Sequence, residues 1–481
     1  MKKILPGTCV LLLVAACTSD VAVAPPPMTA GSASASQSAA TNSYIIDFTG
    51  NTVPTTLSAD VAKAGGSLNQ TLDGIGLAVA TSDYPGFAAR AAKIAGVRVV
   101  TQDRIVQWTS PARVSDAVEE ATETTDATSQ ATTIGATETF RKIQWNVDAV
   151  SAPAAWAAGQ QGAGARVAVI DGGIWSNHID VAPNLDAAHS ASFVPGKAYN
   201  TDVGTFWHGT HVAGIIAAPA NNIGTVGIAP KATIIGVKAL DNGSGAFSWI
   251  INAIYYAATP IAQGGGGADI INMSLGASFM SNDDGAVQLK NALSKATTYA
   301  HEHGVTVIAS AGNNATDLDH TKNLLFVPAM SAHVIAVSAT GPLDFAHGAT
   351  NFDRPASYTN YGQSAILLAG PGGDAALPGN DICSFQRFPS GSSFQYCWVL
   401  DMVMAPCRGS ISSISSYCWA AGTSMSSPAV AGVAALIIGK HGKLPPAQVE
   451  SILRQSADDL GKPGNDDYYG RGRVNAFRAI Q

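Results

Sequence analysis

The C-terminal two-thirds of this 481-residue chain alternates between short, almost wholly apolar runs and longer stretches of helical character. The apolar runs are rich in β-branched residues, as is typical of strands buried on both faces of a sheet. Helix-like stretches, such as residues 248–258 and 287–302, lie between them. This alternation predicts an α/β domain over residues 143–481, with a parallel sheet and helices on both of its faces. The predicted strands are residues 167–170, 234–240, 270–273, 305–309 and 334–337.

A smaller unit precedes this domain, at residues 43–110. Strand-like segments alternate there with a helix-like stretch at residues 84–94, which predicts a small α+β domain. Residues 111–142 are acidic and rich in Thr and Ala, without apolar periodicity. We expect these residues to form an exposed linker that contains a processing site. The predicted strands of the small domain are residues 44–48, 76–80 and 97–100.

The N-terminus has the pattern of an export signal. Two lysines are followed by an apolar run, residues 10–16, that is too short to span a membrane. Residues 1–17 end in Val-Ala-Ala-Cys and resemble a bacterial lipoprotein signal, in which Cys17 is lipidated and begins the mature chain. An ordinary cleaved signal peptide is the alternative. Residues 18–42 are rich in Ala, Ser, Thr and Pro, as in a flexible tether. We expect an exported protein, anchored at the cell surface or outer membrane through Cys17 or secreted after processing.

Charge and composition narrow the class of partner. The formal net charge is -7, and charged residues make up only 13% of the chain. Phosphate binding requires clustered positive charge, and the sequence has no long basic run. These features exclude nucleic acid as an expected partner.

Four of the six cysteines lie close together near the C-terminus. In an exported protein, an even and clustered set predicts two disulfides, but four cysteines allow three pairings and the sequence does not choose among them. A zinc site is the alternative, although no C-x-x-C spacing is present. We therefore expect no metal site here. The four cysteines are Cys383, Cys397, Cys407 and Cys418.

Three short motifs carry residue types that hydrolyse amides. Asp171 ends an apolar run, His208 begins the segment HGTHVAG, and Ser424 lies in GTSM just before an apolar, helix-like stretch. Amide hydrolysis requires a nucleophile, a base and donors for the oxyanion, and a helix N-terminus favours loss of a hydroxyl proton. Each motif alone has a simpler explanation: a strand-end turn, a metal ligand and a helix cap. Together the three motifs are far more specific evidence for amide hydrolysis than any one of them alone.

The three residues occur in the order Asp, His, Ser, and from residue 143 onward the chain resembles the subtilase family of serine proteases. Gly172 stands where the family usually has Ser or Thr, and Ala429 where it usually has His, but neither position performs the chemistry. Residues 371–421, which hold the four late cysteines, form an insertion. Further matches are GIAP at 227–230, INMSLG at 271–276 and SAGN at 310–313.

The resemblance implies a role for individual residues. Asp171, His208 and Ser424 are expected to form the catalytic triad, and Asn313 to help form the oxyanion hole. The expected activity is hydrolysis of peptide bonds in protein or peptide substrates through a covalent acyl-enzyme, with no cofactor required for the chemistry. Structural calcium is common in the family, although no acidic loop in the sequence identifies a site. The segment expected to pair with the substrate backbone is Ser274, Leu275 and Gly276.

The resemblance also covers the small N-terminal unit. Residues 43–110 resemble an inhibitory propeptide, which assists folding, inhibits the enzyme within the same chain and is removed by self-cleavage; an unrelated small domain is the alternative. Two other functions remain open at this point. One is a lipid-anchored binding or adhesion protein built on a protease scaffold, and the other is a peptide ligase or cyclase that uses the same acyl-enzyme.

Overall fold

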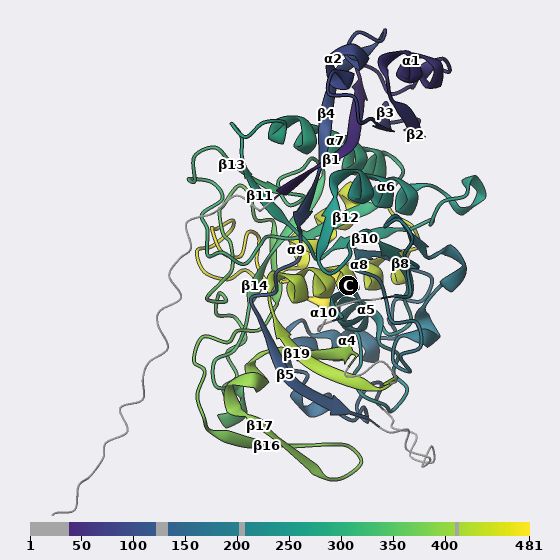
Figure 1. Ribbon diagram of the computed structural model, residues 1–481. Coiled ribbons are helices and arrows are strands. Elements are labelled where there is room, and N and C mark those ends of the chain that lie inside the picture. Colours follow the sequence, from purple (N-terminus) through teal and green to yellow (C-terminus); the bar gives the residue numbers. More distant parts are fainter. Residues whose placement is uncertain (1–37, 122–132, 202–206, 409–412) are drawn as a thin grey trace, which may run out of the picture.

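The computed structural model describes residues 38–121, 133–201, 207–408 and 413–481, and its centre is a seven-stranded sheet (Figure 1). All neighbouring strands in this sheet are parallel. The five runs predicted from the sequence are its five inner strands, so the predicted α/β fold is confirmed. Across the sheet the strands are β15 (Leu368–Pro371), β14 (Val334–Thr340), β12 (Thr306–Ser310), β10 (Ile270–Met273), β6 (Arg166–Asp171), β8 (Thr233–Lys238) and β7 (Ala191–Ser192).

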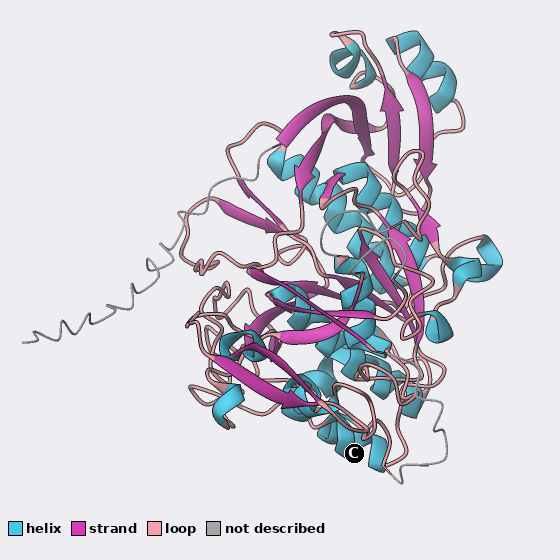
Figure 2. Ribbon diagram, turned by 60° about the horizontal axis from the view of Figure 1, so that its bottom comes forward, coloured by secondary structure: helices cyan, strands magenta, loops and turns pink. Residues whose placement is uncertain are grey.

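Helices cover both faces of this sheet (Figure 2). Val167 and Val169 of β6 belong to one apolar cluster, whereas Ala168 and Ile170, which alternate with them, belong to another. Residues 423–438 of α8 are all buried, as expected for a helix that is apolar on every side. The first cluster contains residues of α3 (Trp145–Ala149), α4 (Ala152–Ala157), α5 (His208–Ala217), α8 (Thr423–His441), α9 (Pro446–Ser456) and α10 (Ala476–Ala479), and the second contains residues of α6 (Phe247–Ala258) and α7 (Ala286–Glu302).

The N-terminal part is a small α+β domain, as predicted, at one end of the molecule (Figure 1). Its four antiparallel strands gain a fifth from the larger domain, β9 (Ser244–Ala246), which pairs with β4. The predicted signal peptide, Cys17 and most of the predicted tether lie outside the described residues. Within the described ranges, no helix is both long and apolar enough to cross a membrane. The small domain consists of β1 (Ser38–Phe48), α1 (Leu57–Ala64), β2 (Ser67–Leu72), β3 (Leu77–Thr81), α2 (Phe87–Ala91) and β4 (Val97–Gln107).

The small domain is docked on α6 and α7 by apolar packing and by a buried ion pair. Its residues Ile45, Leu77 and Trp108 belong to the same apolar cluster as α6 and α7. The carboxylate of Asp47, whose side chain is only 3% exposed, lies 2.7 Å from Nζ of Lys295 on α7. Because both the apolar cluster and this ion pair cross the boundary, the two domains share a continuous interface.

The segment expected to be an exposed linker contains a strand instead. Residues Arg113–Glu120 form β5, which pairs antiparallel with β19 (Ser416–Ala421), and β19 pairs on its other edge with β18 (Val403–Cys407). The exposed fractions along β5 alternate, as expected for a strand with one covered face. Residues 113–120 therefore differ from the exposed linker that their acidic composition suggested.

The insertion at residues 371–421 is built from two hairpins, each closed by one disulfide. Cys383 is joined to Cys397, and Cys407 to Cys418. The second disulfide lies across the β18–β19 hairpin, immediately before the segment that contains Ser424. The remaining strands are β16 (Ile382–Gln386) and β17 (Ser392–Tyr396), which form the first hairpin, and β11 (Ala277–Met280) and β13 (Leu324–Val327), which form a separate pair.

Candidate active site

The carboxyl ends of the central strands bring three of the expected residues to one edge of the sheet. Asp171 is the last residue of β6, Ser274 follows β10, and Asn313 follows β12. The chain leaves β6 toward β8 on one side of the sheet and returns through β10 on the other, so the strand order reverses at this point. In sheets of this kind, such a reversal is where a crevice opens and where ligands bind.

Asp171 and His208 form a close, buried pair. The Asp171 Oδ2 and Oδ1 atoms lie 2.8 and 3.0 Å from His208 Nδ1. Oδ1 of Asp171 also accepts a hydrogen bond from the Gly172 backbone amide at 2.6 Å. The side chains of Asp171 and His208 are 1% and 8% exposed. This arrangement fixes the imidazole with a proton on Nδ1 and leaves Nε2 as the basic nitrogen.

Ser424 is the second residue of α8, so its side chain lies at the positive end of a 19-residue helix. Its hydroxyl donates to the backbone carbonyl of Ser274 at 3.2 Å. The Ser274 hydroxyl in turn donates to the Ser424 carbonyl at 2.8 Å. These reciprocal contacts tie the start of α8 to the end of β10, and thereby fix the position of Ser424 at the sheet edge.

The amide of Asn313 is oriented by Thr423, a residue that the sequence did not single out. Asn313 Oδ1 accepts from the Thr423 backbone amide at 2.9 Å and from its hydroxyl at 2.8 Å. Nδ2 is therefore directed the other way, and it donates to the backbone carbonyl of Ser110 at 2.8 Å. The sequence signal that could have identified Thr423 is its position directly before Ser424 in the GTSM motif. Asn313 thus presents its donor to a peptide carbonyl.

A backbone segment of the N-terminal part lies across this site, held from both sides. The amide of Gly276 donates to the Trp108 carbonyl, and the Trp108 amide donates to the carbonyl of Gly243, at 2.8 Å in each case. Of the expected residues 274–276, Gly276 is therefore the one that bonds this backbone. Gly243 was missed, although two glycines in the segment Asn-Gly-Ser-Gly are a sign of close backbone approach.

The side chain of Trp108 is buried next to this backbone pairing. Trp108 is 2% exposed, and its indole Nε1 donates to the Gly245 carbonyl at 2.9 Å. Its ring meets Phe247 edge to face, with 4.8 Å between the ring centres. The chain therefore has a buried aromatic side chain two positions before the residue whose carbonyl faces Asn313.

A second histidine links the start of α5 to the cysteine-rich insertion. His211 lies one helical turn after His208, and its Nε2 is 3.2 Å from the Cys418 carbonyl on β19. Burial lowers the pKa of His211 to about 3, although this hydrogen bond partly opposes the shift. The imidazole is therefore neutral near neutral pH and donates to that carbonyl, so α5 and β19 remain tied together next to the site.

Two buried carboxyl groups, those of Asp180 and Glu138, lie close enough to repel each other. Burial raises the pKa of Asp180 to about 8, and burial together with repulsion from Asp180 raises the pKa of Glu138 to about 8. Among the described residues, neither Asp180 Oδ1 nor Glu138 Oε2 has a hydrogen-bond partner, although both atoms are buried. Unsatisfied carboxylate oxygens of this kind are ligands for a hard cation such as calcium.

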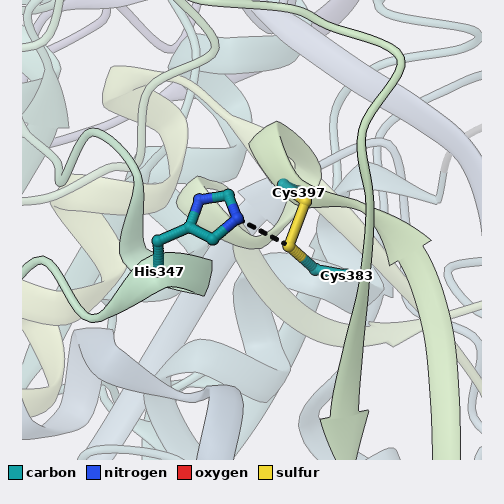
Figure 3. A group of neighbouring side chains, drawn as sticks. All are labelled: His347, Cys383 and Cys397. Carbon is teal, nitrogen blue, oxygen red and sulfur yellow. Dashed lines mark hydrogen bonds between the residues drawn. A yellow bond between two sulfur atoms is a disulfide. The ribbon is translucent and has the colours of Figure 1, made fainter.

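The grouping of His347, Cys383 and Cys397 does not fit a metal (Figure 3). The two sulfur atoms are bonded to each other, and His347 Nε2 lies 3.6 Å from Cys383 Sγ. Metals bind deprotonated thiolates, which a disulfide does not offer. The zinc alternative for these two cysteines is therefore inconsistent with the structure.

Comparisons with known proteins agree with this geometry. The model of the subtilase family matches residues 162–472. Subtilisin NAT of Bacillus subtilis subsp. natto is 34% identical over 346 residues, which cover 72% of this chain and 73% of the relative. The crystal structure of a lanthipeptide protease has 28% identity and a TM-score of 0.57, covering 71% of this chain and 95% of that chain. The epidermin leader peptide processing serine protease of Staphylococcus aureus has a TM-score of 0.69 over 92% of this chain and 98% of its own, at 20% identity, and so shares the fold.

Proposed function

Because this chain belongs to the subtilase family of serine endopeptidases, we propose that Asp171, His208 and Ser424 are its catalytic triad. The single observation that best supports this proposal is a peptide carbonyl, that of Ser110, 2.8 Å from the side-chain donor of Asn313. This contact supports the proposal because a peptide carbonyl is bonded to the donor that we expect to bind the oxyanion.

The mechanism begins when the Ser424 hydroxyl gives up its hydrogen bond to the Ser274 carbonyl and donates to His208. His208 accepts the proton as the serine oxygen attacks the scissile carbonyl, and Asp171 stabilises the imidazolium. Asn313 and the Ser424 backbone amide bind the oxyanion, and each such donor contributes about 3 kcal/mol in the transition state. His208 protonates the leaving amine, and water then releases the acyl-enzyme with His208 as the base.

We further propose that the protein is an exported precursor in which the N-terminal domain is an inhibitor. The support is the continuous interface with α6 and α7, the Asp47–Lys295 ion pair, and the passage of residues 108–112 through the site. Lipidation of Cys17 would keep the precursor at a membrane surface, as the N-terminal sequence predicts.

The experiment that tests self-processing compares the wild-type precursor with Ser424→Ala in a host that lacks other proteases. The wild-type enzyme should lose the N-terminal domain, about 100 residues, through a cut at a bond within the linker 111–142, whereas the variant should stay uncut. Intact mass and N-terminal sequencing measure both outcomes. Processing of the variant to the same N-terminus as the wild type would show that another protease performs the cut.

We propose that Glu138 and Asp180 hold a structural calcium ion. A cation between the two carboxylates would remove the penalty of burying their charge, so calcium should raise the melting temperature of Ser424→Ala protein, which cannot digest itself. At a calcium concentration about 100 times the dissociation constant, the expected stabilisation is about 2.7 kcal/mol. Thermal unfolding in calcium and in EDTA measures it.

The matched variants are Glu138→Gln, which should lose the calcium response, and Glu302→Gln, at an acidic residue on α7, which should keep it. Equal melting temperatures in calcium and in EDTA for the parent protein would contradict the proposed calcium site.

A further inference from the structure

The chain presents one particular bond of its own to the catalytic residues. The carbonyl that faces Asn313 belongs to Ser110, so the bond in the position of the scissile bond is Ser110–Pro111. The backbone before it is paired in the same register, since Trp108 bonds both Gly243 and Gly276. Just after it, the Ala112 amide lies beside Gly422: a Cβ added to Gly422 would be 3.5 Å from that nitrogen. The chain thus runs from the side chain of Asn313 to Gly422, which lies two residues before Ser424.

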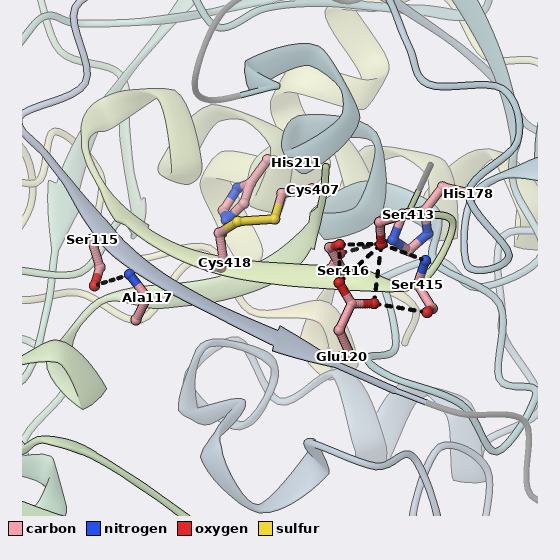
Figure 4. Close-up of a disulfide and its surroundings, with 10 residues drawn as sticks. All are labelled: Ser115, Ala117, Glu120, His178, His211, Cys407, Ser413, Ser415, Ser416 and Cys418. Carbon is pink, nitrogen blue, oxygen red and sulfur yellow. Dashed lines mark hydrogen bonds between the residues drawn. A yellow bond between two sulfur atoms is a disulfide. The ribbon is translucent and has the colours of Figure 1, made fainter. Parts of the chain in front are cut away.

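The strand that follows, β5, lies alongside β19 (Figure 4). Arg113 and Val114 of β5 pair with Ala421 and Ala420 of β19, directly before the GTSM motif. The pairing continues as far as Glu120, opposite Ser416.

Side chains add to this backbone pairing at the distal end of β5. The Glu119 carboxylate lies 3.3 Å from the guanidinium of Arg387. The Glu120 carboxylate accepts from the hydroxyls of Ser413 and Ser415, at 2.9 Å for the shortest contact of each, and from that of Ser416. Figure 4 shows Glu120 among these three serines. The peptide on the leaving-group side is therefore held by a strand pairing and by two anchored carboxylates.

We propose that residues 108–120 are a built-in substrate mimic, bound in the productive register but protected from cleavage by Pro111 and by the anchored strand β5. This inference rests on the proposed catalytic triad. It goes beyond inhibition by the N-terminal domain, because it names the bond that the chain presents and the reason that this bond survives.

The protection follows from the chemistry of the leaving group. Attack of Ser424 Oγ on the Ser110 carbonyl carbon forms a C–O bond and transfers the hydroxyl proton to His208. For the C–N bond to break, His208 must return that proton to the lone pair of the leaving nitrogen. The nitrogen of Pro111 carries ring carbon Cδ in place of hydrogen, and the ring locks rotation about its N–Cα bond. The lone pair is thus hindered from turning toward His208, and the intermediate collapses back to the intact peptide.

Strand β5 provides the second protection. If the bond does break, the amine of Pro111 begins a strand that is still paired with β19 and anchored through Glu119 and Glu120. Water cannot compete well with an amine held next to the acyl-enzyme, because a tethered nucleophile has a very high effective concentration. The amine attacks the ester, the serine oxygen takes its proton back through His208, and the Ser110–Pro111 bond forms again.

The proposal is tested with the full precursor carrying Pro111→Ala. This variant should be cut between residues 110 and 111 at a rate about 100-fold or more above that of the wild type, since general acid catalysis contributes at least this factor. The new N-terminus, read by sequencing, should begin at residue 111. The double variant Pro111→Ala/Ser424→Ala should stay uncut. A wild-type precursor that is cut at Ser110–Pro111 as fast as Pro111→Ala would overturn the proposal.

The same position of the scissile bond, after Ser110, can be tested in trans with two synthetic peptides that cover residues 104–118. One peptide contains Pro111, and the other has Ala in its place. Processed wild-type enzyme should cut the Ala peptide after Ser110, and should bind the Pro peptide as an inhibitor without cutting it. If the enzyme cuts casein but does not cut the Ala peptide after Ser110, the substrate-mimic proposal is wrong and the proposed function stands. Enzyme that cuts neither would count against the proposed function itself.

The anchor is tested by adding Glu120→Ala to Pro111→Ala. Loss of the anchor should let the cut strand leave, so that the fraction of chains cut at equilibrium rises. The matched control is Asp116→Ala, at an exposed position of the same strand, which should leave this fraction unchanged. An equal fraction in both variants would show that Glu120 does not hold the leaving side.

Discussion

Replacing Ser424 with Ala is expected to lower peptide hydrolysis by on the order of 10⁶-fold, the loss known for the nucleophile of the related subtilisin. The variant loses only one oxygen atom, so the fold should persist. The buried Asp171–His208 pair remains, but no acyl-enzyme can form. The measurement is kcat on an internally quenched peptide, with enzyme freed of its N-terminal domain by an added protease.

Ser331→Ala is the matched control for this prediction. Ser331 is also a buried serine, and within the described residues its hydroxyl has no hydrogen-bond partner, so its removal should leave kcat unchanged. A Ser424→Ala variant that kept more than a small fraction of wild-type activity would show that another group is the nucleophile. If the protein only bound peptides on a protease scaffold, the wild type would show no hydrolysis, and neither would Ser424→Ala or Ser331→Ala.

Replacing Asn313 with Ala is expected to lower kcat by about 10²- to 10³-fold, or roughly 3–4 kcal/mol of transition-state stabilisation. Its amide donates to a peptide carbonyl at 2.8 Å, and the contact should strengthen when that oxygen becomes negative. Because the donor acts mainly in the transition state, KM should change by only a few-fold. Steady-state kinetics on the same quenched peptide separates the two constants.

Two variants show whether the donor itself is responsible. Asn313→Asp keeps an oxygen that can accept from Thr423 but loses the donor, so it should be at least as inactive as Asn313→Ala. Asn314→Ala, at the exposed neighbouring position, should behave like the wild type. If KM changed as much as kcat, and if Asn314→Ala lost as much activity as Asn313→Ala, the result would indicate a general disturbance of the loop.

Much of the larger domain could be predicted because its signals are local. The five inner strands are nearly continuous apolar runs rich in β-branched residues, and each is buried on both faces, so composition within a short segment identifies them. Asp171 ends β6, His208 begins α5 and Ser424 lies in the first turn of α8, and the structure brings Asp171 and His208 into contact. Strand β7 was missed because its two residues carry too little pattern, and β15 because Gly370 and Pro371 interrupt its apolar run.

The path of the N-terminal part through the site could not be predicted in the same way. Residues 113–120 contain three acidic residues and no strong apolar face, so their composition is that of a linker. They form a strand because β19, about 300 positions later, offers an edge to pair with. The contact between Asn313 and Ser110 likewise joins residues 203 positions apart. Pairings of this kind depend on the tertiary fold.

The two buried carboxyl groups of Glu138 and Asp180, and the disulfides, illustrate the same limit. Glu138 lies in the segment expected to be a linker, and only the folded chain places it near Asp180. The pairing of the four cysteines follows from the two hairpins of the insertion, whose strand register the sequence does not specify. Functional residues could thus be predicted where a single sequence motif contains them, but not where a feature depends on contacts between distant segments.

The most direct test of the central claim is the mass of the processed enzyme after reaction with a fluorophosphonate, which traps an activated serine. The proposed triad predicts one adduct per chain, on the tryptic peptide that contains Ser424, and none when His208 is replaced with Ala. An adduct on another residue, or an equal yield in the His208→Ala variant, would contradict it.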